Sequence, residues 1–280
     1  MPQHSHITLP SGITLHVVEE GPQDGKLLIF LHGFPEFWYG WRHQISYFAQ
    51  QGYHVVVPDQ RGYNLSDKPK SVADYSLDKL SEDVVALIDH FKKQKAVIVG
   101  HDWGGVVAWW TAFRFKKRVE KNIILNVPHP RVMQKYLATD PTQTLRSWYI
   151  LFFQLPFLPE KMMTFVGPQS LRQSSRAGTF TDTDLEFYQK AWSQPGALTG
   201  MINWYRAGLR HPPKKLGTER ITVPTLLIWG KKDAFLKHQM AQPSVDLCDT
   251  GKLVYLENAS HWVAHEEPQE VNRLISEFIA

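Results

Sequence analysis

Cysteine is nearly absent from the 280-residue chain, in which Cys248 is the only one. One cysteine can form neither an internal disulfide nor a cysteine-based metal cage, and such usage is typical of a reducing compartment. Long apolar runs are missing too: the nearly apolar residues 148–158 include Gln154 and Pro156 and have about half the ~20 residues of a membrane-spanning helix. Residues 1–12 contain no apolar segment typical of a secretory signal. We therefore expect a cytoplasmic protein without membrane contact.

A strong excess of charge of one sign is also missing. The chain carries 31 basic and 27 acidic residues, for a formal net charge of +4. The basic residues fall in short pairs, as at 92–93, 116–117 and 231–232, which are more often solvated surface than a phosphate-binding stripe. We therefore expect no nucleic-acid partner. Hydrophobic residues make up 43% of the chain, which is ample for a buried core and excludes a disordered class.

The chain does contain a regular alternation of two patterns. Short apolar or β-branched runs, several of them nearly continuous, indicate strands buried on both faces. They lie at residues 13–18, 27–31, 54–57, 96–99, 123–127, 225–229 and 253–256. Amphipathic helical patterns separate most of them, most clearly at residues 77–91, 106–115 and 271–279. The alternation predicts an α/β fold with a mainly parallel central sheet flanked by helices, after an antiparallel start.

One segment, residues 130–217, interrupts the alternation because it has many aromatic residues but no convincing strand. It begins after the run at 123–127 and ends before the run at 225–229, so we expect a helical cap over the carboxyl ends of the strands, where α/β sheets bind ligands. The predicted organisation is a core of residues 1–129 and 218–280 with this cap inserted.

Residues 100–105 read GHDWGG and lie between a predicted strand and a helical pattern. Small residues at this place allow the sharp strand-to-helix turn of a nucleophile elbow, whose pattern is G-x-S-x-G. The raised residue here is Asp102 instead of serine. A carboxylate serves poorly in ordinary acyl transfer, but it can displace a leaving group from saturated carbon and form an alkyl ester. The alternative is that Asp102 only forms the turn or caps the helix.

Two later residues fit a triad with Asp102. Asp233 and His261 each come just after the carboxyl end of a predicted strand, and the chain order nucleophile, acid, histidine is that of hydrolases with a nucleophile elbow. Asn126 occupies another position from which a side chain could support the histidine, but it lacks the charge. His261 and His265 have the spacing of a metal pair, yet the glutamate of a zincin motif is missing, so we expect no metal.

The predicted strand at 27–31 runs into residues 32–36, which read HGFPE, and the glycine and proline favour a tight loop facing the elbow. Hydrolysis of an alkyl ester passes through a tetrahedral oxyanion, which the backbone N–H groups of Phe34 and Trp103 can stabilise. We expect His32 to brace this loop instead of acting as a base.

Together these residues resemble the epoxide hydrolases of the α/β-hydrolase fold, and the similarity spans nearly the whole chain. It is carried by residues 32–36, by 41–44 (WRHQ), 59–63 (DQRGY) and 100–105, by Asp233, and by 260–262 (SHW). The elbow alone is less specific, because haloalkane dehalogenases share an aspartate followed by tryptophan.

The lid separates the two families. In epoxide hydrolases two lid tyrosines hold the epoxide oxygen, and the resemblance places them at Tyr149 and Tyr205. Ring opening by a carboxylate generates an alkoxide, to which a neutral phenol with a pKa of about 10 can donate a proton. The predicted substrate contacts are Phe34, Trp103, Tyr149, Phe153 and Tyr205, with Leu155 and Trp192 as further candidates for the tunnel wall.

The resemblance implies an enzyme that converts small apolar or aromatic epoxides to vicinal diols through an ester on Asp102, with water activated by His261 and Asp233 and without a cofactor. A haloalkane dehalogenase with the same aspartate is the first alternative, although Phe34 stands where many of those enzymes carry a halide-binding asparagine. A non-catalytic small-molecule receptor on the same scaffold is the second, and its expected mark is a broken triad. Either a monomer or a homodimer fits the sequence.

Overall fold

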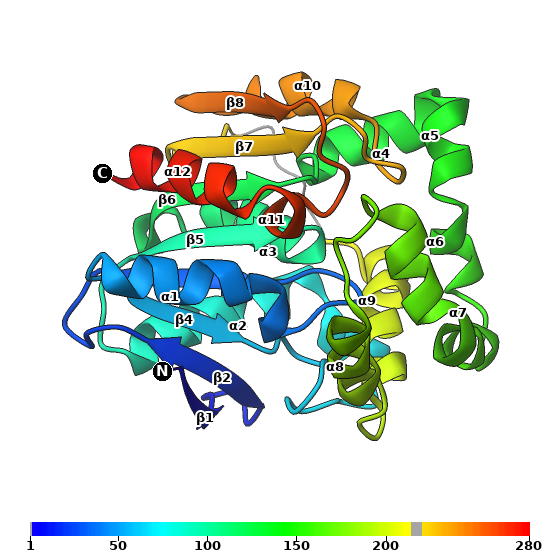
Figure 1. Ribbon diagram of the computed structural model, residues 1–280, viewed down its shortest axis with the longest axis horizontal. Helices are drawn as coiled ribbons and strands as arrows, with labels where there is room; N and C mark the ends of the chain where they lie inside the picture. The colour runs from blue at the N-terminus through cyan, green and yellow to red at the C-terminus, as the bar shows by residue number, and fades with distance from the viewer. Residues whose placement is uncertain (1, 214–219) are drawn as a thin grey trace.

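The computed structural model describes residues 2–213 and 220–280. Its centre is an eight-stranded sheet in the order β1-β2-β4-β3-β5-β6-β7-β8 (Figure 1). The strands are β1 (Gln3–Thr8), β2 (Thr14–Glu20), β3 (Leu27–Leu31), β4 (His54–Pro58), β5 (Ala96–His101), β6 (Val119–Leu125), β7 (Thr225–Gly230) and β8 (Gly251–Leu256). β1 pairs antiparallel with β2, and β2 antiparallel with β4, whereas all later pairs are parallel. The predicted α/β architecture is confirmed.

Two differences from the sequence-based expectation have simple causes. The strand β1 was not predicted, because its sequence QHSHIT is mostly polar and only Ile7 is buried at this edge of the sheet. β6 begins at Val119, four residues before the expected run, since the partly exposed Glu120 and Lys121 interrupt its apolar pattern. Edge position and partial exposure both remove the continuous apolar run on which the prediction depended.

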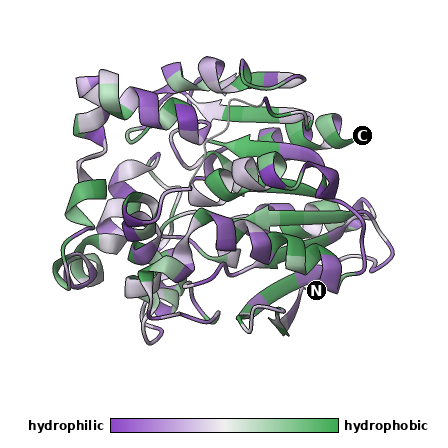
Figure 2. Cartoon of the chain, turned by 180° about the vertical axis from the view of Figure 1, so that it is seen from behind, coloured by the Kyte–Doolittle hydropathy of each residue, from purple (hydrophilic) through white to green (hydrophobic). Residues whose placement is uncertain are grey.

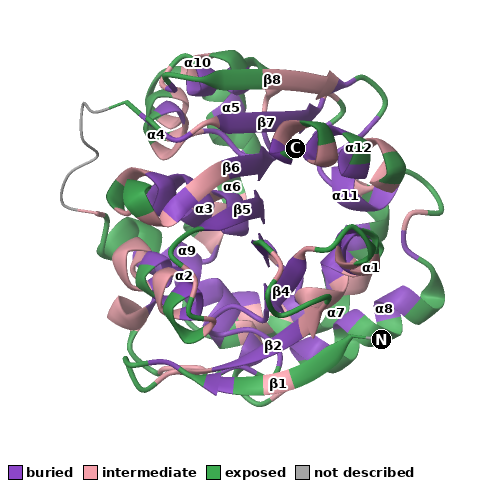
Figure 3. Ribbon diagram, turned by 90° about the vertical axis from the view of Figure 1, so that its left-hand side faces the viewer, coloured by how far each residue is buried: buried purple, intermediate pink, exposed green. Residues whose placement is uncertain are grey.

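Helices cover both faces of the sheet, and the parallel strands β3, β4, β5 and β7 are buried along their whole length (Figure 3). On β3 every residue is buried, and alternate side chains enter different cores: Leu28 and Phe30 join one cluster, Ile29 and Leu31 the other. Each fully buried side chain of this size contributes about 1.5–3 kcal/mol relative to exposure. Figure 2 shows the resulting band of apolar strands at the centre of the molecule.

One helical layer comes from the first half of the chain alone, whereas the other joins a helix of the first half to the last two helices. α2 (Leu77–His90) and α3 (Trp103–Arg114) pack on one face, and α1 (Arg42–Gln50), α11 (Val263–Glu266) and α12 (Pro268–Ile279) on the other (Figure 3). The short α10 (Ala241–Val245) packs beside the edge strand β8. The two layers hold the carboxyl ends of the strands in fixed register, and the loops at those ends carry the candidate catalytic residues.

Between β6 and β7 the described residues form helices and no strand. These are α4 (Pro130–Thr139), α5 (Pro141–Arg146), α6 (Trp148–Phe152), α7 (Leu158–Ser174), α8 (Asp182–Trp192) and α9 (Ala197–Arg210). Helices α6 to α9 lie beyond one end of the sheet (Figure 1). The predicted boundary at residue 217 lies outside the described residues. Within the described ranges, no helix combines the length and apolar character needed to cross a bilayer.

Candidate active site

Asp102 sits at a sharp turn between β5 and α3. Its φ of +50° lies in the left-handed region, which side-chain-bearing residues seldom adopt. The turn requires small neighbours, because a Cβ on Gly100 would lie 2.3 Å from the Gly104 carbonyl oxygen, and one on Gly104 would lie 2.1 Å from that of Leu31. Asp102 takes the N-cap position of α3, but its side chain makes no capping hydrogen bond. The carboxylate is therefore free to face the neighbouring loops.

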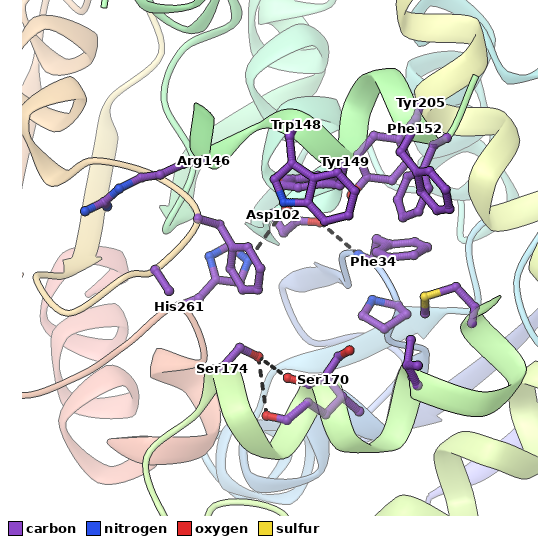
Figure 4. A pocket seen from close by; sticks show the side chains of 18 of the residues that line it. Phe34, Asp102, Arg146, Trp148, Tyr149, Phe152, Ser170, Ser174, Tyr205 and His261 are labelled. Carbon is purple, nitrogen blue, oxygen red and sulfur yellow. Dashed lines mark hydrogen bonds and ion pairs between the residues drawn. The ribbon is translucent and has the colours of Figure 1, made fainter. Parts of the chain in front are cut away.

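Two side chains from separate loops meet this carboxylate. His261 directs Nε2 toward Asp102 Oδ2 at 3.7 Å (Figure 4). Its Nδ1 lies 2.7 Å from Asp233 Oδ2. The other oxygen of Asp233 accepts hydrogen bonds from the N–H groups of Phe235 and Leu236 at 2.8 and 2.9 Å. The structure thus brings the three predicted triad residues together, in the order carboxylate, imidazole, buried carboxylate.

Asn126, considered above as an alternative support for His261, contacts Asp233 and the neighbouring backbone instead. Its Nδ2 donates to Asp233 Oδ2 at 2.8 Å and to the Ser260 carbonyl at 3.2 Å, while its Oδ1 accepts from the Gly230 N–H at 3.0 Å. Asn126 therefore holds Asp233 in place and does not replace it.

The charges in this cluster are strongly coupled. Burial lowers the pKa of His261, but the carboxylates of Asp233 and Asp102 outweigh that effect and raise it to about 10. Burial raises the pKa of Asp102, and the opposing pull of His261, with a smaller one from the Phe34 N–H, leaves it below its usual value. The free site therefore holds an imidazolium between two carboxylates at neutral pH.

The loop of residues 32–36 brings a backbone donor to the nucleophile. The Phe34 N–H donates to Asp102 Oδ1 at 2.8 Å, and a Cβ on Gly33 would lie 2.4 Å from Asp102 Cβ (Figure 4). Trp103 is the first residue of α3, so its N–H has no partner within the helix. Of the two predicted oxyanion donors, the Phe34 N–H therefore contacts the carboxylate, and the Trp103 N–H follows Asp102 directly in the chain.

His32 braces this loop from the core side. Its Nδ1 is 3.0 Å from the Gly33 carbonyl oxygen, to which it donates, and its Nε2 accepts from the Gln60 N–H at 3.0 Å. These two bonds require a neutral ring, and burial lowers the pKa of His32 accordingly. This arrangement fits the bracing part expected for His32.

Two tyrosines line the same cavity as the Asp102 carboxylate. Tyr149 on α6 and Tyr205 on α9 pack edge to face, with ring centroids 5.9 Å apart. Burial and the nearby charge of Asp102 raise the pKa of both phenols well above the usual value. Each phenol therefore stays protonated at neutral pH and can donate a hydrogen bond into the cavity.

The cavity has a volume of about 550 Å³ and is lined mainly by apolar and aromatic side chains of α5 to α7. Of the predicted site residues, Asp102, His261, Tyr149, Tyr205, Phe34 and Phe153 line it. Trp103 does not, and its ring packs edge-on against Tyr205 at a centroid distance of 5.1 Å. The further candidates Leu155 and Trp192 also lie outside the lining. The loop after β7, through Ala234 and Phe235, completes the wall.

Known proteins share this fold over nearly its full length. Residues 26–268 match the family described as the alpha/beta hydrolase fold. The chain is 46% identical over 273 residues to the AB hydrolase superfamily protein YfhM of Bacillus subtilis, which covers 96% of this chain and 95% of that relative. It is 40% identical over 279 residues to epoxide hydrolase 4 of Mus musculus, covering 96% of this chain and 77% of that relative.

A solved structure of an epoxide hydrolase also matches this chain over nearly its full length. Epoxide hydrolase of Bacillus megaterium, crystallised in complex with an inhibitor, matches with a TM-score of 0.89 and 32% identity, covering 98% of this chain and 99% of that chain. The chain belongs to the epoxide hydrolases of the α/β-hydrolase fold. The family expected from the resemblance is therefore confirmed, and the protein is an enzyme.

A buried charge centre beside the triad of this epoxide hydrolase was not predicted from the sequence. Glu36 accepts hydrogen bonds from His101 at 3.0 Å, from His265 at 2.6 Å and from Tyr188 at 2.8 Å. Burial raises the pKa of Glu36, but the two histidines hold it well below its usual value. The members lie far apart in sequence, and only the place of Glu36 in the HGFPE segment offered a signal.

His101 links this charge centre to the catalytic histidine. Its Nδ1 faces Glu36, and its Nε2 lies 2.8 Å from the carbonyl oxygen of His261. Through these two contacts His101 joins Glu36 to the backbone of His261. His265, considered above as a metal partner of His261, instead contacts Glu36.

Proposed function

We propose that this chain hydrolyses epoxides to vicinal diols through a covalent hydroxyalkyl ester on Asp102. One observation carries the proposal: two neutral phenols, Tyr149 and Tyr205, line the same cavity as the carboxylate of Asp102 and the imidazole of His261. A nucleophile for carbon and a proton donor for oxygen are what opening of an epoxide ring requires. The names of the related proteins point to the same reaction.

In the first half-reaction, Oδ2 of Asp102 attacks a ring carbon, because Oδ1 is engaged by the Phe34 N–H. The C–O bond of the ring breaks, and its oxygen takes a proton from one of the two tyrosines. The result is a hydroxyalkyl ester and a tyrosinate. The charge of Asp102 is lost in this step, so the pKa of His261 falls. The imidazolium proton then restores the tyrosine, and His261 is left as a neutral base.

In the second half-reaction, His261 takes a proton from a water that attacks Cγ of Asp102. The negative charge that develops on Oδ1 is held by the N–H groups of Phe34 and Trp103. The tetrahedral intermediate expels the diol oxygen, which receives the proton from His261. The new Asp102 carboxyl ionises and its proton returns to His261, so that epoxide and water are converted to diol with no net change in the enzyme.

The segment that carries the two tyrosines also indicates the class of substrate. We propose that the helical segment of residues 130–217 forms the cap and supplies both tyrosines and most of the apolar cavity wall. Since the wall is largely aliphatic and aromatic, the proposed substrates are small apolar or aromatic epoxides.

A haloalkane dehalogenase is the competing proposal with the same nucleophile. A departing halide needs no proton donor, so neither tyrosine would have a role in that reaction. Phe34 is also an apolar neighbour for a halide, and the described lining of the cavity contains no asparagine. Bromide release from bromoalkanes, measured beside diol formation, separates the two reactions.

The test is a single turnover of styrene oxide in H₂¹⁸O with the enzyme in excess. An ester mechanism predicts an unlabelled first-turnover diol and one ¹⁸O in the peptide that contains Asp102. Label directly in the diol means that water attacks the ring and that Asp102 is misassigned. The His261→Gln variant is the matched control, since it retains the nucleophile but lacks the base, and its intact mass increases by the mass of the epoxide.

A further inference from the structure

The cap contacts the loop of residues 32–36, here called the oxyanion loop, through two hydrogen bonds that have no part in the proposed chemistry. From α8, the indole Nε1–H of Trp192 donates to the Pro35 carbonyl oxygen at 2.7 Å, and the Tyr188 hydroxyl donates to Glu36 at 2.8 Å. Trp192 is 6% exposed and Tyr188 is fully buried, so both bonds are shielded from water. The two acceptors, Pro35 and Glu36, directly follow Phe34 in the chain, and the Phe34 N–H donates to Asp102.

The loop is therefore held from two sides. On the core side, Gln60 hydrogen-bonds to the ring and to the carbonyl oxygen of His32, the first residue of the loop. On the cap side, α8 donates hydrogen bonds to Pro35 and Glu36. The peptide N–H of Phe34 lies between these attachments. Loss of a contact from α8 loosens this end of the loop at Pro35 or Glu36, while Glu36 keeps its contacts with His101 and His265 and the triad remains in place.

The two half-reactions do not depend equally on the position of that N–H. While Asp102 attacks, its carboxylate loses charge, so the hydrogen bond to Oδ1 weakens toward the transition state. While water attacks the ester, charge develops on Oδ1 and the same bond strengthens. Only interactions that strengthen toward a transition state accelerate a step. A displaced Phe34 N–H should therefore slow ester hydrolysis and leave ester formation unchanged or slightly faster.

We propose that Trp192 and Tyr188 are positioning residues for the second half-reaction: α8 of the cap holds the oxyanion loop in register with Asp102. This inference rests on the proposed ester mechanism. The cap then serves both half-reactions, the first through its tyrosines in the cavity and the second through a helix that does not line the cavity.

The test is Trp192→Phe, which removes the N–H donor and keeps an aromatic ring. Ester formation and ester decay are followed separately by rapid acid quench and intact-mass spectrometry. A lost hydrogen bond of ordinary strength predicts a decay rate about fivefold to tenfold lower and a formation rate within about twofold of the parent. In the steady state kcat and KM fall together, and kcat/KM is retained.

Trp110→Phe is the matched control. Trp110 is also a largely buried tryptophan, and its indole N–H donates at 2.9 Å to Asp78, far from the oxyanion loop. It should lose stability without a change in either rate. If Trp192→Phe slows both steps alike, or lowers only the melting temperature, Trp192 is merely structural and the proposal is overturned.

Tyr188→Phe provides an independent second variant, should Trp192→Phe not fold. It removes one of the three donors to Glu36 and should also slow ester decay selectively. Unchanged decay in a folded Tyr188→Phe overturns the part assigned to Tyr188. Absence of any ester in the parent enzyme is a different failure, because it refutes the ester mechanism itself.

Discussion

The replacement Asp102→Asn tests whether the charge of the nucleophile controls the protonation of His261. His261 Nε2 lies 3.7 Å from Asp102 Oδ2, and the pKa of His261 is raised to about 10. At that distance and an effective dielectric constant of about 20, the attraction is about 4 kcal/mol. Removal of the charge should lower the pKa of His261 by up to about 3 pH units. The variant imitates the ester in its lack of charge.

The assay is an NMR titration of the labelled His261 ring in the parent and in the variant. Asp233→Asn is the companion variant, and it should also lower the pKa of His261, because the 2.7 Å contact is lost as a charged pair. If the titration midpoint of His261 does not move in Asp102→Asn, the charge of the nucleophile does not hold the proton, and the proposed release of the base after alkylation is wrong.

Three further results are expected. Tyr149→Phe and Tyr205→Phe should each slow ester formation by about 10²–10³, measured by quenched mass spectrometry, and equal slowing of ester decay would contradict their assignment to the epoxide oxygen. Gly104→Ala should destabilise the fold by at least about 1–3 kcal/mol in chemical denaturation, since its Cβ would lie 2.1 Å from the Leu31 carbonyl oxygen; an unchanged midpoint would refute the packing argument. Because the folded-state pKa of His261 is raised to about 10, its stabilisation is complete below about pH 6.5 and is lost as pH rises through 10; a His261→Gln variant should lack that part of the decline in unfolding free energy.

The parts of the site that follow local rules could be predicted. Asp102, Asp233 and His261 each follow an apolar run, and the carboxyl ends of parallel strands meet at one edge of the sheet. Phe34 was predicted from the same rule, because HGFPE follows β3, the neighbour of β5. The cap tyrosines came from family resemblance instead, since an aromatic-rich helical segment offers no periodicity that singles out two phenols.

The parts that depend on long-range contacts could not be predicted. The partners of Glu36 stand at positions 101, 188 and 265, and no spacing rule joins residues so far apart. Trp192 was expected to line the tunnel, yet its indole N–H donates to the oxyanion loop. Trp103 was expected to contact substrate, yet its ring packs against Tyr205 outside the cavity lining.

The α/β alternation, the elbow and the order of the triad follow from local sequence, because they depend on apolar runs, small residues at a turn and the chain direction of parallel strands. Which side chains of α6 to α9 face Asp102, and which hold the loop of residues 32–36, depends instead on how these helices pack. The reason is physical: a helix in the cap buries side chains on several faces, and its rotation and docking are set by packing against distant residues, which no local pattern encodes.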